Sequence, residues 1–379
     1  MGPSGLAQAP LVVANLAGLG SGGAVTYLRG VAYELLRRPH NDVRWRLLIT
    51  AEQRALIDGE DRPGVEFTVL PKRGPAARMG WEQLVLPRAR MVEPASVLVA
   101  AANFGRGRKG LPCVVIAHNA LHFSDFRQPG WSGRRLMLEA SLARCSVRRA
   151  AAAVAPSEAM ARRICAQTDV APAVLPFGPG LGLRFRAPTG DRFTFIHRTS
   201  WGPHKRFGTL LEAVRQLALR RPRAFRLHSA CDPRTPFAQR WPEGRADAAL
   251  LSDAAVRQHV EIAGPAPGEQ VIEASAAVIP SDVESFCFPL AEALAGGLPA
   301  VAADADYARE MCGEAAFYAA PGDAAGLAQA MERLLDGERP LPAPRGWSDR
   351  YSWAAHVDGL AELCRGVAKR PLGEPRIGI

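Results

Sequence analysis

Two glutamates eight residues apart, Glu284 and Glu292, form the most chemically informative pattern in the sequence. Pro289 and Gly296-Gly297 mark the start and the end of a predicted helix, because proline favours a helix start and glycine follows a helix end. Glu292 would then fall in the first turn of this helix. The helix start and the preceding loop can bind an anion through backbone N–H groups, whereas carboxylates accept hydrogen bonds from hydroxyl groups. A phosphate flanked by hydroxyl groups describes a nucleotide sugar. A solvent-facing pair of glutamates on a capped helix is the simpler alternative.

A second group of charges follows an apolar run at 193–197. Arg198 and Lys205 lie in the stretch H-R-T-S-W-G-P-H-K-R-F-G, between a predicted strand and a predicted helix. Only four residues of the chain are lysine, against 43 arginines. Lysine binds phosphate as a compact point charge, so the loop could neutralise a diphosphate. We expect this loop to be exposed. An ordinary basic surface loop is the alternative to a phosphate site.

The N-terminal part offers two weaker signals. Gly18–Gly23 fits G-x-G-x-x-G after a predicted strand, which is the pattern of a dinucleotide site. That pattern also needs an acid about twenty residues further on, and the nearest one at a strand end, Glu52, is well past that distance. His118 directly follows the apolar run 113–117, with His122 close behind. A histidine at the carboxyl end of a parallel strand is a candidate for ligand contact.

The elements that must position these residues follow from the apolar pattern. Short apolar runs alternate with amphipathic stretches on both sides of a turn-rich segment at 174–180. This order predicts an α/β protein with two doubly wound parallel sheets, which bind ligands at the carboxyl ends of their strands. Predicted strands of the first sheet are 11–15, 46–50, 65–70, 97–101, 113–117 and 151–155. Predicted strands of the second sheet are 193–197, 225–228, 260–263, 276–279 and 299–302.

Length and charge also favour two domains. The chain has 379 residues, and a domain usually has roughly 100–200. Residues 1–180 contain 23 Lys and Arg against 13 Asp and Glu, whereas the remainder has 24 of each sign. The basic half suits an anionic membrane face or an acidic acceptor, with a solvated basic surface as the alternative. No motif for nucleic-acid recognition accompanies the charge, so we expect no nucleic-acid partner.

Targeting signals and cysteine spacing give a cytoplasmic expectation. No apolar run reaches the roughly 18 residues of a membrane-spanning helix, and no basic-then-apolar leader opens the chain. The seven cysteines include no C-x-x-C pair, which argues against a disulfide framework or zinc ribbon. Peripheral contact with the inner face of a membrane stays open.

The stretch E-S-F-C-F-P-L-A-E, followed by A-L-A-G-G-L-P-A-V, resembles the E-x7-E motif of retaining GT-B glycosyltransferases, in particular the family called GT4. The resemblance is strong over 190–336 and looser before it. It implies the GT-B fold, in which two Rossmann-like domains face a cleft. The implied domains are an acceptor-binding domain over 1–180 and a nucleotide-sugar domain over 181–346. A last helix within 347–379 would pack back on the first domain.

The resemblance also implies roles for single residues. The first motif acid, here Glu284, contacts the transferred sugar in that family, and the second, Glu292, contacts the ribose. An Arg and a Lys that neutralise the leaving diphosphate match Arg198 and Lys205, and Arg206 could replace Arg198. A family histidine that contacts the donor sugar matches His118, with His122 as the fallback. The implied donor-binding residues also include Gly22, Gly23, Ser285, Phe286, Cys287 and Phe288.

The family pattern is not matched everywhere, and alternatives remain. GT4 enzymes usually have glycine where Ser285 and Cys287 stand, so the backbone approach of this loop to a diphosphate is in question. The resemblance implies a retaining, metal-independent transferase that needs no cofactor besides its nucleotide-sugar donor. Its acceptor would be a small molecule, a glycan or a lipid-linked group. An NAD(P)-dependent oxidoreductase using Gly18–Gly23, or a pseudo-glycosyltransferase that couples sugar-like rings, is the alternative.

Overall fold

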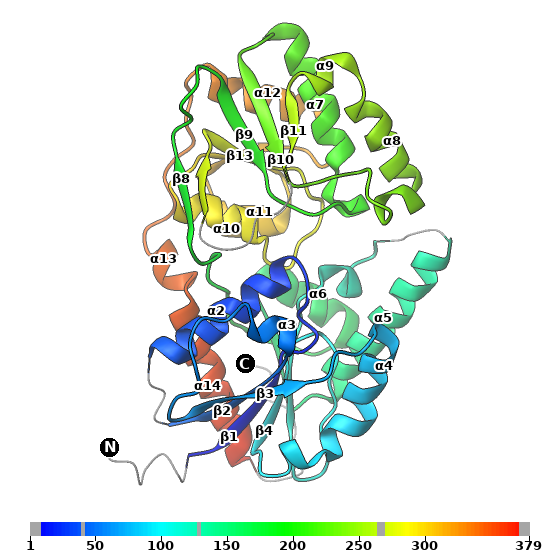
Figure 1. Ribbon diagram of the computed structural model, residues 1–379, viewed down its shortest axis with the longest axis vertical. Coiled ribbons are helices and arrows are strands. Elements are labelled where there is room, and N and C mark those ends of the chain that lie inside the picture. The colour runs from blue at the N-terminus through cyan, green and yellow to red at the C-terminus, as the bar shows by residue number, and fades with distance from the viewer. Residues whose placement is uncertain (1–8, 39–41, 127–129, 264–269, 371–379) are drawn as a thin grey trace. The chain divides into compact units, whose positions relative to one another are not determined.

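Two separate parallel β-sheets form the framework of the chain (Figure 1). The computed structural model describes residues 9–38, 42–126, 130–263 and 270–370. It divides into a first unit, Met1–Gly178 with Asp349–Ile379, and a second unit, Pro179–Ser348. The predicted α/β class with two doubly wound parallel sheets is confirmed.

The sheet of the first unit has seven strands in the order β3-β2-β1-β4-β5-β6-β7, all parallel. All five residues of β1 are buried, as expected for a central strand covered on both faces. Since β1 lies between β2 and β4, the strand order reverses there, and the loops after β1 and β4 diverge at the carboxyl edge. The strands are β1 (Leu11–Asn15), β2 (Arg44–Thr50), β3 (Val65–Leu70), β4 (Val97–Ala100), β5 (Cys113–Ile116), β6 (Ala152–Ala155) and β7 (Ala173–Val174).

One segment of the first unit departs from a regular α-helix. The segment that follows α4 is a π-helical turn at Trp81–Val85 and then two short 3-10 turns, up to Val92. π-helical turns are rare and often occur at functional sites. The α-helices are α2 (Gly23–Arg37), α3 (Ala51–Arg54), α4 (Pro75–Gly80), α5 (Gly130–Arg149), α6 (Glu158–Thr168) and α14 (Trp353–Lys369).

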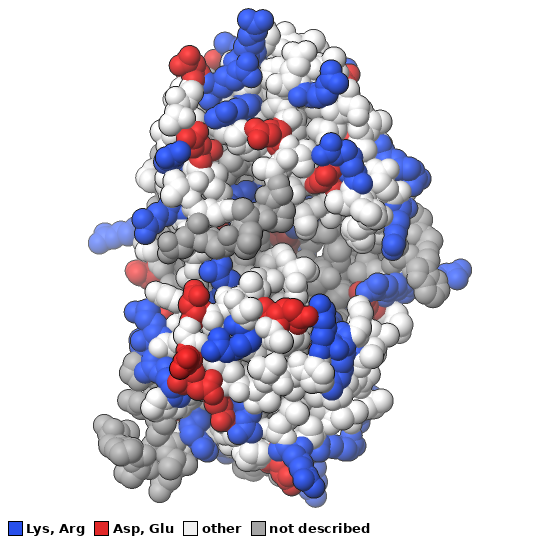
Figure 2. Space-filling model, viewed as in Figure 1, with Lys and Arg blue, Asp and Glu red and all other residues white. Residues whose placement is uncertain are grey.

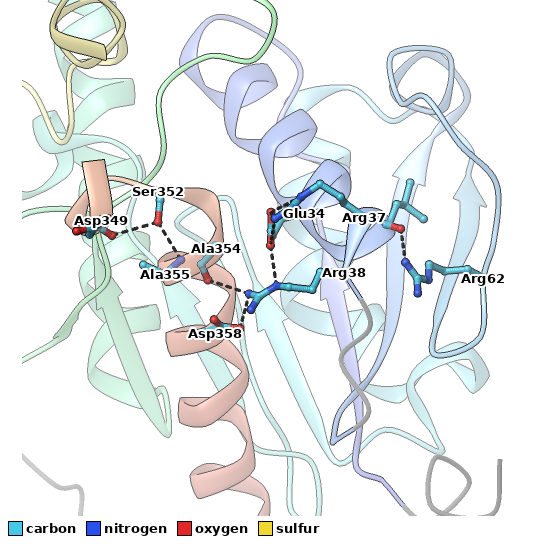
Figure 3. A network of polar contacts seen from close by, with 10 residues as sticks. Glu34, Arg37, Arg38, Arg62, Asp349, Ser352, Ala354, Ala355 and Asp358 are labelled. Carbon is cyan, nitrogen blue, oxygen red and sulfur yellow. Dashed lines mark hydrogen bonds and ion pairs between the residues drawn. The ribbon is translucent and has the colours of Figure 1, made fainter. Parts of the chain in front are cut away.

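The C-terminal helix α14 packs on α2 within the first unit. A side chain at Gly30 would collide with the Trp353 indole, because its Cβ would lie 2.0 Å from the ring. The Tyr27 hydroxyl lies 3.0 Å from Nε2 of His356, which joins the two helices in the interior. Closer to solvent, Arg38 donates hydrogen bonds to Glu34 of α2 and Asp358 of α14 (Figure 3).

The sheet of the second unit has six strands in the order β11-β10-β9-β13-β14-β15. Its order reverses beside β9, which lies between β10 and β13. The strands are β9 (Phe193–His197), β10 (Phe225–Ser229), β11 (Val260–Ile262), β13 (Ala276–Ile279), β14 (Ala300–Ala303) and β15 (Ala316–Ala319). The helices are α7 (Phe207–Arg220), α8 (Pro242–Leu251), α9 (Ala254–Arg257), α10 (Phe288–Ala295), α11 (Asp306–Cys312), α12 (Ala324–Leu335) and α13 (Trp347–Arg350), the last of which crosses the unit boundary.

The sequence did not predict a small additional sheet in the second unit. Strands β8 (Leu183–Arg186) and β12 (Gln270–Glu273) form a parallel pair apart from the main sheet. β8 alternates apolar and charged residues, as Leu-Arg-Phe-Arg, and β12 has only two apolar residues, Val271 and Ile272. Arg186 donates to Glu273 at 2.8 Å. A pair of strands that is covered on one face only lacks the continuous apolar run that is typical of strands buried on both faces.

The charges of the surface are mixed. Figure 2 shows Lys and Arg side chains in small groups with Asp and Glu between them, on the face in view. In the described ranges, no helix is long and apolar enough to span a membrane.

Candidate functional site

The carboxyl edge of the second sheet brings the predicted charges together. Strands β9 and β13 are neighbours, so the loops that follow His197 and Ile279 leave the sheet side by side. The backbone N–H of Asp282 donates to the carbonyl of His204 at 2.9 Å, which ties the two loops. The first loop carries Arg198 and Lys205, and the second leads to Glu284 and α10. The arrangement therefore depends on the strand order, which reverses at this point.

Lys205 and Glu284 form a largely buried ion pair. Nζ of Lys205 donates to Oε1 of Glu284, and their side chains are only 17% and 13% exposed. The expectation that the Lys205 loop is exposed was therefore wrong for this side chain, because the neighbouring loop covers it. Burial alone would raise the pKa of Glu284, but Lys205, with His204 and Ser281, outweighs burial and holds it below its ordinary value. Glu284 is consequently ionised at neutral pH.

Arg198 and Glu292 form a second, looser pair. Their closest atoms, Nε of Arg198 and Oε2 of Glu292, are 3.9 Å apart. Glu292 is the fifth residue of α10, so it lies in the second helical turn and not in the first, as the sequence suggested. Burial raises the pKa of Glu292 to about 7, although the charge of Arg198 opposes this shift. The two acids thus differ, because one is ionised at neutral pH and the other is poised to gain or lose a proton.

The other predicted cation, Arg206, serves a different acid. Its Nε donates to Oδ2 of Asp282 at 2.6 Å, and its side chain is 48% exposed. Arg206 adopts the left-handed conformation just before α7, and its half-exposed side chain is bound to Asp282. Arg198 is therefore the arginine that accompanies Glu292.

The loop before α10 presents its backbone and buries its side chains. Phe286 and Phe288 are buried with their ring centroids 5.0 Å apart, and Cys287 is buried as well. Any ligand contact from these residues would thus come from N–H and C=O groups. Cys287 is the residue before the helix and has φ of 63°, a region that costs a non-glycine residue roughly 1–2 kcal/mol. A backbone conformation that glycine favours is thus found at Cys287, where the family pattern usually has glycine.

Glu292 is also confined by the segment that enters the second unit. A Cβ atom at Gly180 would lie 2.3 Å from Oε1 of Glu292, closer than any ordinary contact. The absence of a side chain at Gly180 therefore leaves room for the carboxylate. The sequence marked this segment only as turn-rich.

In the first unit, the glycine loop lies at the carboxyl end of β1. Gly22 has φ of 56° and is the residue before α2, so only glycine fits it without strain. Gly22 and Gly23 are exposed, and α2 begins with no side-chain cap and no acid in its first turn. The N–H groups of Ala24 and Val25 donate to the carbonyls of Ser21 and Gly22, at 3.3 and 3.0 Å. The positive end of the helix therefore faces no acidic side chain that would compete with an anion.

His118 is held on both sides at the carboxyl end of β5. Its backbone N–H and that of Asn119 donate to Oδ1 of Asn103, at 2.6 and 2.9 Å. The imidazole stacks on Phe177 at 5.1 Å and meets the edge of Tyr27 at 4.5 Å between ring centroids. Burial, together with His356, lowers the pKa of His118 to about 3, so the ring is neutral near pH 7. The ring can therefore contact a ligand, but only as an uncharged group.

The fallback histidine and a residue that sequence reasoning missed have structural roles nearby. His122 is 2% exposed, and its Nε2 lies 3.2 Å from the Asn119 amide and 3.8 Å from Glu139. Asn103 was not singled out as a site residue, yet it fixes the backbone of His118 from a left-handed conformation, with φ of 68°. Its place before Phe104-Gly105, after a buried strand, is the signal that could have identified it.

The dinucleotide alternative for the glycine loop finds no favourable geometry. Glu52, the acid nearest to the end of β2, is exposed and paired with Lys72 at 3.0 Å. It is a residue of α3, where the capping hydrogen bonds come from Thr50 and Gln53. In the described part of the chain, no group of three or more His, Cys, Asp or Glu side chains could hold a metal ion.

Buried neutral histidines should make the protein acid-sensitive. Burial, with the charge of Lys205, lowers the pKa of His197 to about 3, and burial lowers that of His356 to about 4. Each is near 6.5 in the unfolded chain, so the unfolded state binds more protons between about pH 6.5 and 4. Stability is complete above this window and falls through it, by about 2 kcal/mol per histidine between pH 7 and 5.

Urea unfolding of the wild type and His356→Gln at pH 7 and pH 5 measures this effect. The variant should lose about 2 kcal/mol less on acidification, because it has one fewer group to titrate. An identical loss in both proteins would show that His356 is not held neutral by the fold.

Comparison with known proteins gives a consistent picture. Residues 190–337, less than half of the chain, match the family model described as glycosyl transferases group 1. A comparison with curated proteins finds no matching sequence. Among solved structures, HepE of Anabaena in complex with UDP-glucose has a TM-score of 0.68 and 16% identity, over 94% of this chain and 99% of that one.

Two further structures are similar over nearly their whole length. Sucrose-phosphate synthase from Thermosynechococcus elongatus has a TM-score of 0.64 and 14% identity, over 95% of this chain and 99% of that one. The lipopolysaccharide outer core galactosyltransferase WaaB has a TM-score of 0.60 and 15% identity, over 94% and 99%. The chain therefore has the GT-B fold, and its residues 190–337 are similar to the group 1 glycosyl transferases.

Proposed function

We propose that this protein is a retaining glycosyltransferase of the GT4 type, which transfers a sugar from a nucleoside diphosphate sugar to an acceptor without a metal ion. The observation that carries the proposal is the pairing of Lys205 with Glu284 and of Arg198 with Glu292 at one sheet edge. Two cations suit a diphosphate, and two carboxylates suit the hydroxyl groups of a sugar and a ribose. The match of residues 190–337 to group 1 glycosyl transferases supports this reading.

The residues then divide the work of the reaction. The bond from the anomeric carbon to the diphosphate oxygen breaks, and the acceptor oxygen bonds to that carbon on the same face. The acceptor proton passes to the leaving diphosphate, so no strong enzymic base is required. Arg198 and Lys205 stabilise the charge that develops on the diphosphate, a role that is often the largest single contribution to catalysis. Glu284 would contact the transferred sugar, and Glu292 the ribose.

We assign the acceptor to the first unit, and we assign His118, Gly22 and Gly23 of that unit to contacts with the donor. The net charge of +10 over residues 1–180 would favour an acceptor or membrane surface of negative charge. A small molecule, a glycan and a lipid-linked group all remain acceptor candidates. Neither the oxidoreductase nor the pseudo-glycosyltransferase alternative has a supporting observation.

The test is release of nucleoside diphosphate from a panel of UDP-, GDP-, ADP- and dTDP-sugars, with water or added sugars and lipids as acceptors. One donor should be turned over equally well with and without EDTA, and proton NMR of the first product should show the anomeric configuration of the donor. An inverted product would overturn retention, and loss of activity in EDTA would overturn metal independence. No release from any donor would overturn the proposal.

Substitution of Gly180 should weaken nucleotide binding, although no charged residue is replaced. In Gly180→Ala, the new methyl group would displace the carboxylate of Glu292, since their separation would be 2.3 Å. Loss of a charge-assisted hydrogen bond to the ribose costs roughly 1.5–3 kcal/mol, which corresponds to about 10- to 150-fold weaker binding. Calorimetric titration with the nucleoside diphosphate of the preferred donor measures this change.

Gly190→Ala is the matched control for this substitution. Gly190 is exposed, has ordinary backbone angles and has no atom within 4 Å of its Cβ position. Its affinity should equal that of the wild type. Equal affinity in Gly180→Ala would mean that Glu292 does not contact the nucleotide from this position.

A further inference from the structure

Three side chains outside the glycine loop, those of Gln53, Arg78 and Glu82, contact residues 15–19, the base of this loop. Gln53, which is 4% exposed, donates from Nε2 to the carbonyl oxygens of Leu16 and Leu19, both at 2.9 Å. Arg78 donates from Nη1 to the carbonyl of Gly18 at 3.0 Å. Three backbone carbonyls of the loop, those of Leu16, Gly18 and Leu19, thus accept hydrogen bonds from side chains that do not belong to the loop.

The third side chain, Glu82, is the buried residue of the π-helical turn. Its Oε1 accepts from the Asn15 amide at 3.0 Å, and it lies 3.8 Å from Nε of Arg78. Asn15 in turn accepts from the N–H of Ala17 at 3.3 Å. Glu82 therefore supports the loop from both ends, through Asn15 at its start and through Arg78 at Gly18.

A buried carboxylate is expensive and needs a reason. Glu82 is 1% exposed, and its Oε2 has no hydrogen-bond partner among the described residues. An apolar residue could fill the same space without the cost of desolvating a charge. A glutamate adds the hydrogen bond from Asn15 and the ion pair with Arg78, and both of these residues contact the glycine loop.

We call this set of contacts the clamp, and it leaves the tip of the loop exposed. Leu19 is buried, and Gly18 is packed so closely that its Cβ would lie 2.6 Å from that of Ala102, just beyond β4. By contrast, Gly20–Gly23 are exposed up to the start of α2. A rigid base with an exposed tip is the arrangement expected of a loop that must present backbone groups at fixed positions.

We propose that Gln53, Arg78 and Glu82 are positioning residues for glycosyl transfer, which act by fixing the base of the glycine loop. The proposal rests on the function proposed above, and it concerns residues that touch neither donor nor acceptor. Because their bonds are to the loop, their loss should move the loop tip and misalign the reacting groups. A misplacement of about 1 Å can lower a rate about 100-fold.

Glu82→Gln tests this inference, because it retains the shape and one oxygen for Asn15 but removes the charge that holds Arg78. The turnover number should fall by about 10- to 100-fold. Affinity for the nucleoside diphosphate should stay within about threefold, since the charged residues proposed to bind it, Arg198, Lys205 and Glu292, belong to the second unit. Glu93→Gln is the control, because Glu93 is an exposed acid of the same segment, and it should match the wild type.

Arg78→Met provides a second route to the same result. Arg78 is 28% exposed, so this variant should fold even if Glu82→Gln does not. It removes the bond to Gly18, and its turnover should fall in the same range. A purely structural role would lower the melting temperature and leave turnover per folded molecule unchanged, and that outcome would overturn the proposal.

Hydrogen exchange separates this inference from the proposed function. The N–H groups of Leu19 and Gly20 donate within the loop, to Leu16 and Gly18, at 2.9 and 3.2 Å. Both should exchange faster in Glu82→Gln and Arg78→Met, but not in Glu93→Gln. Unchanged exchange would show that no clamp exists. A wild type that turns over no nucleotide sugar would instead refute the proposed function, and the positioning role with it, while exchange would still decide whether the loop is clamped.

Discussion

Replacement of Lys205 by alanine should lower turnover by about 100- to 1,000-fold, because one preorganised charge on the leaving diphosphate is lost. It should also lower the free energy of unfolding by about 3 kcal/mol, since Glu284 would remain largely buried without its partner. Steady-state release of nucleoside diphosphate and urea unfolding measure the two effects. The second effect was not expected from the sequence, which suggested an exposed lysine.

A double variant separates catalysis from stability. Lys205→Ala with Glu284→Gln removes both charges, so most of the lost stability should return while turnover stays low. Arg206→Ala is the control for the loop, because it removes an adjacent cation whose partner is Asp282. It should keep near-native turnover. If Lys205→Ala itself turns over donor at the native rate, its ion pair with Glu284 is structural only.

The two glutamates should respond differently to substitution. Glu284→Gln keeps the size of the side chain and removes its charge beside the proposed sugar site, so turnover should fall by about 100-fold or more. Binding of the free nucleoside diphosphate, which has no sugar, should remain nearly intact. Glu292→Ala should weaken that binding by roughly 1.5–3 kcal/mol, because a buried charge-assisted hydrogen bond is lost.

Calorimetric titration of both variants, together with steady-state kinetics, distinguishes the roles. Loss of diphosphate binding in Glu284→Gln but not in Glu292→Ala would reverse the assignment. Native binding and native turnover in both variants would remove the nucleotide-sugar reading of residues 280–299.

The fold could be predicted from the sequence because buried parallel strands leave a clear signal. Residues 11–15 and 193–197 are strands over their full predicted lengths, since both are mostly apolar and lie in the middle of a sheet. The strands β8 and β12 left no such signal. The π-helical turn at Trp81–Val85 was also missed, because the sequence pattern of a π turn does not differ from that of an α-helix.

The charged residues of the site could be named from the sequence, but their pairing could not. Lys205 and Glu284 are 79 positions apart, and only the order of β9 and β13 in the sheet places them in contact. The resulting burial explains why Lys205 is not a surface cation. The same limit applies to Gln53, Arg78 and Glu82, whose shared contact with the glycine loop could not be predicted from their places in the sequence.

Proton release on nucleotide binding tests the account most directly. Glu292 has a pKa of about 7 in the free protein, so about half of its carboxyls carry a proton at pH 7. If the carboxylate accepts hydrogen bonds from ribose hydroxyls in the complex, binding should release that proton. The measurement is calorimetric titration with the nucleoside diphosphate at pH 7 in two buffers of different ionisation enthalpy. We expect the nucleoside diphosphate to bind tightly, with up to about half a proton released by the wild type and less by Glu292→Gln. Binding without any difference between the two proteins, or no binding of UDP, GDP, ADP or dTDP, would contradict it.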